Sequence, residues 1–199
     1  MSAIGGVLMF GGRVDPEQLR DLGARLERLG PDGGREVVSD HIGMVYRAFH
    51  TNAESCREHQ PYCWGHQAIL CWDGRLDNRD ELLEQLRDEL RGEDTDAAIV
   101  MAAYRRWRRH GIGKLVGDFA LAIWDRHDQA VWLARDPVGT RTLYYHVDAE
   151  RVIWSTDLGA LLDVGGVAID VSDEFVASHL TDERAPGLTP YVGVHAVKP

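Results

Sequence analysis

The residues best placed to do chemistry lie in the stretch 72–78, which reads Trp-Asp-Gly-Arg-Leu-Asp-Asn. The apolar run before it, residues 68–72, is typical of a strand buried on both faces. Asp73 and Gly74 predict a tight turn, because glycine reaches positive φ without strain and aspartate tolerates it. Such a turn exposes backbone N–H groups, so a binding or catalytic site could be built there. An ordinary strand-to-helix connection explains the same residues equally well.

A helix is predicted to follow this stretch. Asn78 is expected to cap it, with Glu81 completing a capping box. Its apolar stripe consists of Leu82, Leu83, Leu86 and Leu90. The 72–78 stretch therefore connects a buried strand to an amphipathic helix.

The composition restricts the classes of partner and of site. With 199 residues and a formal net charge of −10, the chain would on average repel a phosphate backbone, so we expect no nucleic-acid partner. The basic run at 105–109 is interpreted as a solvated helix end. No apolar run approaches the roughly 20 residues needed to span a bilayer, so we expect a cytoplasmic protein without a membrane partner. The 3 cysteines lack paired metal spacing, and no metal site is expected.

The rest of the pattern predicts strands with helices inserted in pairs. Strands are expected at 4–10, 37–38, 42–49, 117–124, 130–134, 143–147 and 152–155, and helices at 15–29, 92–107, 157–162 and 174–180. A polar loop is expected at 50–67 and another loop at 181–190. An apolar strand almost at the first residue is unusual, because termini are normally frayed. This order favours two sheets packed face to face with helices outside.

Several short motifs occur together in a recognisable order. They are the strand 4–10, Pro31-Asp32-Gly33, Gln60-Pro61, Asp73-Gly74, Asp94-Thr95-Asp96, Gly117-Asp118-Phe119-Ala120, Arg135-Asp136 with Gly139, and Leu143-Tyr144-Tyr145. In this order the chain resembles the N-terminal class II glutamine amidotransferase domain of the asparagine synthetase family. The resemblance implies an α+β fold of the N-terminal-nucleophile hydrolase type, a four-layer αββα sandwich of two mostly antiparallel sheets. It implies an amidotransferase-like domain at 1–165 and a C-terminal extension at 166–199, leading towards a synthetase domain.

The resemblance also assigns the site residues, and the chain departs from the family pattern at most of them. Ser2 stands where active members have a cysteine nucleophile, whose own α-amine acts as base. Asp73 and Gly74 occupy the oxyanion-hole position, where the family has Asn-Gly, and Arg75 replaces an acid that anchors the substrate ammonium. Ala48 aligns with the arginine that clamps the substrate carboxylate, and neighbouring Arg47 is the candidate to replace it.

Asp94 retains the family's ammonium-binding acid, although it could equally cap the second helix. A further hypothesis is that Asp73 and Arg75 form an ion pair, either in the old pocket or as a turn-stabilising contact. The altered residues lead us to expect a glutaminase-degenerate domain. Two alternatives stay open: an active amidotransferase that uses Ser2, and an interaction protein that recruits a peptide through the 50–67 loop.

The form of the 72–78 stretch is closest to asparagine synthetase homologues such as lasso-peptide cyclases. The parent enzyme would then be an ATP-dependent ligase that forms an amide or isopeptide bond, and the present domain would act as scaffold or docking surface. Expected partners are a synthetase domain in cis or in trans and a precursor peptide. No cofactor is expected in this chain, because ATP and Mg²⁺ would belong to the synthetase domain.

Overall fold

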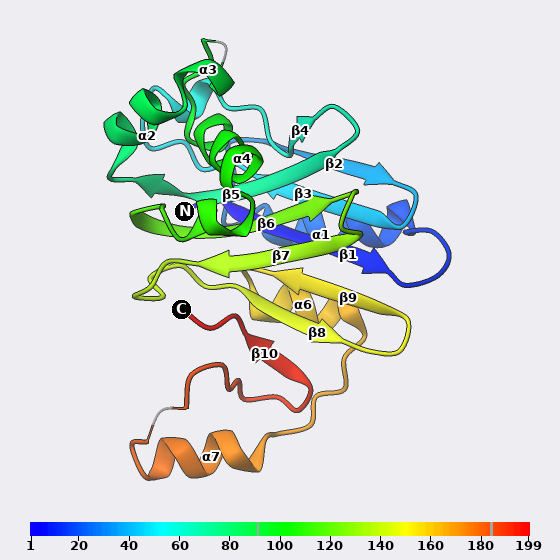
Figure 1. Ribbon diagram of the computed structural model, residues 1–199. Helices are drawn as coiled ribbons and strands as arrows, with labels where there is room; N and C mark the ends of the chain where they lie inside the picture. The colour runs from blue at the N-terminus through cyan, green and yellow to red at the C-terminus, as the bar shows by residue number, and fades with distance from the viewer. Residues whose placement is uncertain (91, 184) are drawn as a thin grey trace.

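The computed structural model describes residues 1–90, 92–183 and 185–199 (Figure 1). One sheet has the strand order β10-β8-β9-β1-β3-β2 and the other has the order β4-β5-β6-β7. The first contains β1 (Ala3–Met9), β2 (Gly34–Ser39), β3 (Ile42–Arg47), β8 (Tyr144–Val147), β9 (Arg151–Ser155) and β10 (Val194–Ala196). The second contains β4 (Tyr62–Trp64), β5 (Ala68–Leu76), β6 (Gly117–Asp125) and β7 (Ala130–Arg135). All described strand pairs within these sheets are antiparallel.

Helices cover the outer face of each sheet, so the molecule has four layers (Figure 1). The six-stranded sheet is covered by α1 (Pro16–Leu26) and α6 (Leu158–Gly165). The four-stranded sheet carries α2 (Arg79–Gln85), α3 (Arg87–Leu90), α4 (Asp96–Trp107) and α5 (Arg109–Ile112). A 3₁₀ turn, η1 (Ser55–Arg57), lies in the loop before β4, and α7 (Asp173–Leu180) lies apart from the two sheets in the C-terminal segment that precedes β10. The predicted sandwich of two antiparallel sheets is confirmed.

The space between the two sheets is filled by alternate residues of the central strands. Ile4 of β1, Met44 of β3, and Ile69 and Cys71 of β5 belong to one buried cluster. The other face of β5 packs under the helices through Leu70 and Trp72. Since side chains alternate along a strand, β5 is buried on both faces, as the apolar run at 68–72 predicts.

The predicted turn at Asp73 and Gly74 is wrong, because β5 continues to Leu76. Gly74 pairs with Phe119 across the β5–β6 ladder and does not have positive φ. A Cβ at this position would lie 2.6 Å from the carbonyl oxygen of Asp118 and 2.6 Å from Cβ of Phe119. The glycine therefore permits close approach of β6, and positive φ is not its role.

Asn78 occupies the predicted N-cap position of α2, but the expected side-chain cap is not formed. Its side chain makes no cap hydrogen bond in α2; its amide donates to the carbonyl of Lys114 at 2.9 Å and its oxygen accepts from the N–H of Val116 at 3.0 Å. Asn78 thus ties the start of α2 to the segment that leads into β6. The helix predicted after it is divided at Leu86 into α2 and α3.

The segment 166–199 adds an edge strand to the six-stranded sheet. β10 pairs with β8, and Val194 and Val197 are buried. Helix α7, by contrast, has no buried residue. Residue 184, within the loop predicted at 181–190, lies outside the described residues. Among the helices that the structure describes, none has the length and apolar character required to cross a bilayer.

Candidate active site

A cavity of about 260 Å³ lies at the end of the sandwich where β1 begins. Its walls combine residues from both sheets, from α4 and from two loops. They include Ser2, Tyr46, Phe49, Glu54, Glu58, Asp73, Gly74, Asp96 and Arg141. Ser2 directly precedes β1 of one sheet and Asp73 lies on β5 of the other, so the stacking of the two sheets brings these two predicted site residues into one cavity.

Ser2 is held in this cavity by its side chain. Its Oγ accepts a hydrogen bond from the backbone N–H of Phe49 at 3.0 Å and lies 3.1 Å from the hydroxyl of Tyr46. The β1–β3 ladder begins at the next residue, where Ala3 pairs with Arg47. The predicted nucleophile position is thus fixed by the first rung of a central ladder, which accounts for an ordered strand so near the terminus.

Asp73 points into the same cavity. It continues the face of Ile69 and Cys71, which lies between the sheets, and only 5% of its surface is exposed. Burial raises the pKa of Asp73 to about 6, although Arg141, the N-terminal ammonium and the backbone N–H of Ser2 each lower it. The nearest cationic side chain that the structure describes is Arg141, whose Nη1 lies 3.8 Å from Oδ2, beyond hydrogen-bond distance.

Arg47 is not in the cavity. Its Nε donates to the carbonyl of Gly23 at 3.0 Å and its Nη2 pairs with Glu36 at 2.5 Å, on the α1 side of the sheet. Successive residues of a strand face opposite sides, so Tyr46 faces the space between the sheets and Arg47 cannot. Ala48, which shares the face of Tyr46, is a buried member of the inter-sheet cluster. The structure therefore does not bring Arg47 to the substrate position that the resemblance suggested.

Arg75 also lies outside the cavity, and the hypothesis of an Asp73–Arg75 ion pair is wrong. Arg75 is exposed and its Nε pairs with Asp77 at 2.8 Å. It lies two residues beyond Asp73 on the same strand face, but there β5 reaches the end of the sheet and its side chain enters solvent. The pairing with Asp77 is a local surface contact.

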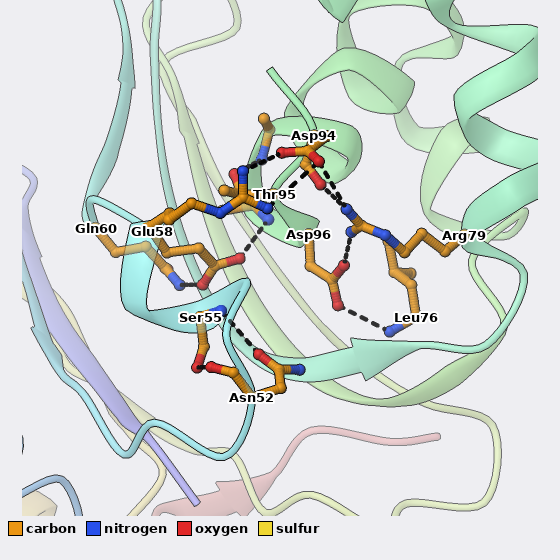
Figure 2. A network of polar contacts seen from close by, with 12 residues as sticks. Asn52, Ser55, Glu58, Gln60, Leu76, Arg79, Asp94, Thr95 and Asp96 are labelled. Carbon is orange, nitrogen blue, oxygen red and sulfur yellow. Dashed lines mark hydrogen bonds and ion pairs between the residues drawn. The ribbon is translucent and has the colours of Figure 1, made fainter. Parts of the chain in front are cut away.

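Asp94 neither caps α4 nor lines the cavity. Thr95 is the cap, since its Oγ1 accepts from the N–H of Ala98 at 3.3 Å. Figure 2 shows Asp94 turned towards arginine side chains; it pairs with Arg57 at 3.2 Å and with Arg79 at 3.8 Å. The acid of this motif that does line the cavity is Asp96, which pairs with Arg79 at 2.5 Å and accepts from the N–H of Leu76 at 3.1 Å.

The loop before β4 closes one side of the cavity through a polar network (Figure 2). Glu58 accepts from the N–H of Ala97 at 3.0 Å and from the amide of Gln60 at 3.0 Å. Gln60 in turn bonds both backbone groups of Trp72, at 2.6 and 2.9 Å. Burial raises the pKa of Glu58, while the contacts with Ala97 and Gln60 lower it. The Gln60-Pro61 motif thus fixes the loop against β5.

Several cavity residues were not assigned to the site from the sequence. Those whose polar groups matter most here are Tyr46, Glu58, Asp96 and Arg141. Strand parity gives a signal for Tyr46, because it shares a face with the apolar Met44 and directly precedes Arg47. Burial raises the pKa of Tyr46 above its ordinary range. Glu58, in a long loop, and Arg141, after the turn that follows β7, offer no such signal.

A larger hollow of about 710 Å³ lies at the other end of β5 and β6, next to Trp64 and Arg108. It includes the cluster Asp125, His127 and Asp128, whose possible ligand atoms lie within 4.8 Å of one another. Arg108 pairs with Asp125 at 2.8 Å and with Asp128 at 3.0 Å, and Tyr104 donates to Asp125 at 2.8 Å. These contacts already pair the carboxylates with Arg108 and Tyr104. We therefore interpret the cluster as a structural ion-pair network and not as a metal site.

Comparison with known proteins agrees with this architecture. The family model of the glutamine amidotransferase domain matches residues 1–199. Asparagine synthetase [glutamine-hydrolyzing] 1 of Bacillus subtilis is 26% identical over 87% of this chain and 28% of its own length. Amidase chyE of Penicillium rubens is 31% identical over 85% of this chain and 25% of its own length. The chain therefore spans about a quarter of the length of these curated relatives.

Solved structures support the fold. Glutamine phosphoribosylpyrophosphate amidotransferase of B. subtilis aligns with a TM-score of 0.59 at 16% identity, over 82% of this chain and 43% of that one. A structure titled as the allosteric regulatory enzyme of purine biosynthesis aligns with a TM-score of 0.63, also at 16% identity and with the same coverage. The chain belongs to the glutamine amidotransferase domain family, as the N-terminal class II type of the asparagine synthetase family.

Proposed function

We propose that this domain is a glutaminase-degenerate amidotransferase domain that serves as scaffold or docking domain in an ATP-dependent amide-forming or isopeptide-forming enzyme. The observation that carries the proposal is the carboxylate of Asp73, buried in the cavity beside Ser2 where the family places an amide donor. Hydrolysis of glutamine passes through an oxyanion, which a carboxylate repels. Loss of one oxyanion-hole donor typically costs about 2.7–4 kcal/mol, and an anion in its place adds repulsion.

The other departures act on substrate binding and on the nucleophile. Arg47 is committed to Glu36 and Gly23, and Ala48 offers no charge, so neither supplies the expected clamp for a substrate carboxylate. The hydroxyl of Ser2 is harder to activate than a thiol whose pKa is about 8.5. Each departure lowers the expected turnover independently of the others.

The parent enzyme is proposed to act in the cytoplasm and to resemble a lasso-peptide cyclase. Its synthetase domain, in cis or in trans, would use ATP and Mg²⁺ to adenylate a carboxylate. An amine of a precursor peptide would then attack this carboxylate, so the reaction would need no ammonia from glutamine. Loss of hydrolysis in the present domain would not impair such a reaction, and Asp94 and Arg75 would then have no substrate role.

A panel of variants tests the degeneracy. Glutamate release from glutamine is measured for chains that begin at residue 2, in wild type, Ser2→Cys, Asp73→Asn and the double variant. We expect no turnover from wild type or from Ser2→Cys alone, and detectable turnover first in the double variant or after further addition of Ala48→Arg. Turnover by Ser2→Cys close to that of an active relative would contradict the role of Asp73.

An active amidotransferase that uses Ser2 is the second candidate. It is favoured by the position of the Ser2 hydroxyl, which lies in the cavity within hydrogen-bond distance of the Tyr46 hydroxyl and the Phe49 N–H. The names of several relatives state that they hydrolyse glutamine. This candidate predicts turnover by wild type that Ser2→Ala abolishes.

A further inference from the structure

We propose that, in the chain that begins at Ser2, the buried carboxylate of Asp73 binds the α-ammonium group of Ser2 and prevents this amine from acting as a base. The inference deepens the proposed function and rests on it. It gives Asp73 a positioning role at the terminus in addition to its effect on an oxyanion.

The α-nitrogen of Ser2 cannot move far when Met1 is removed. The Ser2 side chain is anchored by Tyr46 and Phe49, and Ala3 is the first paired residue of β1. Hydrolysis of the Met1–Ser2 bond by a methionine aminopeptidase consumes one water and releases methionine. The nitrogen that was an amide then becomes an ammonium group at the same place, with a full positive charge in the cavity.

Among the residues that the structure describes, no side chain forms a hydrogen bond with Asp73 that would compete for this interaction. It is 5% exposed, and Nη1 of Arg141, the nearest described cationic side-chain atom, is 3.8 Å away. Nε and Nη1 of Arg141 are buried without a hydrogen-bond partner, so the two side chains are loosely matched. In the chain with Met1, the terminal ammonium and the Ser2 N–H already lower the pKa of Asp73. An ammonium on Ser2 itself would place the full positive charge on the nitrogen whose N–H now acts on Asp73.

The other carboxylates around the cavity are either bound within the protein or exposed to solvent, where water weakens their attraction for an ammonium group. Glu58 is bound by Ala97 and Gln60, and Asp96 by Arg79 and Leu76. Glu54 is exposed, and Tyr46 is neutral because burial raises its pKa. Arg141 opposes protonation of the amine, whereas the carboxylates favour it. Asp73 is therefore the carboxylate available to bind the amine.

An ion pair of this kind blocks the first step of nucleophilic attack. The Ser2 hydroxyl has to transfer its proton to the free amine as its oxygen forms the bond to the substrate carbonyl. A protonated amine has no lone pair to accept that proton. The same carboxylate would thus disable the base and repel the oxyanion.

The test measures the pKa of the Ser2 α-amine from the pH dependence of its acetylation by limiting acetic anhydride, followed by mass spectrometry of the N-terminal peptide. Chains beginning at Ser2 are released from a fusion that is cleaved just before this residue. We expect a pKa about one unit above the ordinary 7.7–8.0 in wild type, and a drop of about one unit, or tenfold in affinity for the proton, in Asp73→Asn. Glu54→Gln removes a carboxylate from the same cavity and should leave the value unchanged.

Equal amine pKa values in wild type and Asp73→Asn would overturn the inference, whatever the glutamine assay gives. Turnover by wild type together with a raised, Asp73-dependent amine pKa would overturn the proposed function and the claim that the ion pair stops the amine from acting as a base, and would leave only the ion pair itself. Should Asp73→Asn fail to fold, ¹³C NMR of the Asp73 carboxyl in wild type gives a second measure. Its pKa should be lower in the chain that begins at Ser2 than in the chain that keeps Met1, and equal values would contradict the inference.

Discussion

Asp73 and Asp136 are two buried carboxylates near Arg141, and they differ in the number of backbone N–H groups that donate hydrogen bonds to them. Asp136, 1% exposed, accepts hydrogen bonds from the N–H groups of Phe119, Val138, Thr140 and Arg141 at 3.0–3.3 Å. Burial alone would raise the pKa of Asp136, but these N–H groups hold it below its ordinary value. Asp73 has no comparable set of donors among the described residues, and its pKa is raised to about 6.

The ionised Asp136 carboxylate therefore stabilises the folded state, whereas the ionised Asp73 carboxylate destabilises it. Asp136 organises the turn after β7, from which Arg141 reaches the cavity. Asp73 is buried between the two sheets, and the groups that favour its charge are the Ser2 N–H, the terminal ammonium and Arg141 at 3.8 Å. Buried charges of the second kind are retained at sites where they act on something other than stability.

The largest effect is expected from Asp136→Ala. This variant leaves four backbone donors without their charged acceptor, and we expect a loss on the order of 3 kcal/mol or more in the free energy of unfolding. Urea denaturation at pH 7.5 measures it, with Asp73→Ala as the matched control. A smaller loss for Asp136→Ala than for Asp73→Ala would remove the distinction between the two carboxylates.

Asp73→Asn is expected to act in the opposite direction. Because the folded pKa of Asp73 is raised, the folded state binds more protons than the unfolded state between about pH 4 and pH 6, so this residue lowers stability as the pH rises. We compare the free energy of unfolding of Asp73→Asn with that of wild type, in chains that keep Met1. The difference between the two proteins should shift in favour of the variant by on the order of 2 kcal/mol when the pH is raised from 4 to 7.5. Thermal and urea unfolding at both pH values measure the gain; a constant difference would contradict a raised pKa.

Arg141→Met sharpens the comparison by removing the cation next to Asp73. We expect a coupling of about 0.5–1 kcal/mol in the free energy of unfolding, from a double-mutant cycle with Asp73→Asn. The coupling is small because Nη1 of Arg141 lies 3.8 Å from Oδ2 of Asp73, beyond hydrogen-bond distance. Unfolding free energies of the four proteins at pH 7.5 give the coupling. A value near zero would mean that Arg141 does not interact with the charge of Asp73.

The smallest effect is expected from Arg75→Ala. Arg75 forms an exposed ion pair with Asp77 at the end of β5 and does not reach the cavity. The melting temperature and the amine pKa of Ser2 should both match wild type. A shift in the amine pKa would show that the charge of Arg75 reaches the cavity after all.

The layered fold was predictable because its signals are periodic. The apolar runs of β5 and β6 identify strands, and Asp15, at the start of the helix predicted at 15–29, caps α1 through the N–H of Glu17. Gly74 misled the prediction, since glycine signals either positive φ or close approach and the sequence does not distinguish them. Asn78 misled it similarly, because its long-range partners at Lys114 and Val116 cannot be seen locally.

Site residues were predictable where the order of the family motifs fixed their place in the fold. They were not predictable where the direction of a side chain decided whether it reaches the cavity. Ser2 and Asp73 meet because two sheets stack, as the resemblance implied. Arg47 fails to join them because one residue of offset on a strand reverses its face. Asp96 lines the cavity in place of Asp94, since the helix that begins there turns Asp96 towards it and Asp94 towards Arg57.

The most direct test of the central claim is glutamate release from glutamine by the wild-type chain that begins at Ser2, with its N-terminus verified by mass spectrometry. The degenerate site predicts a rate equal to that of the Ser2→Ala variant and to the blank. Turnover by wild type that Ser2→Ala abolishes would contradict the claim and establish a serine-dependent amidotransferase.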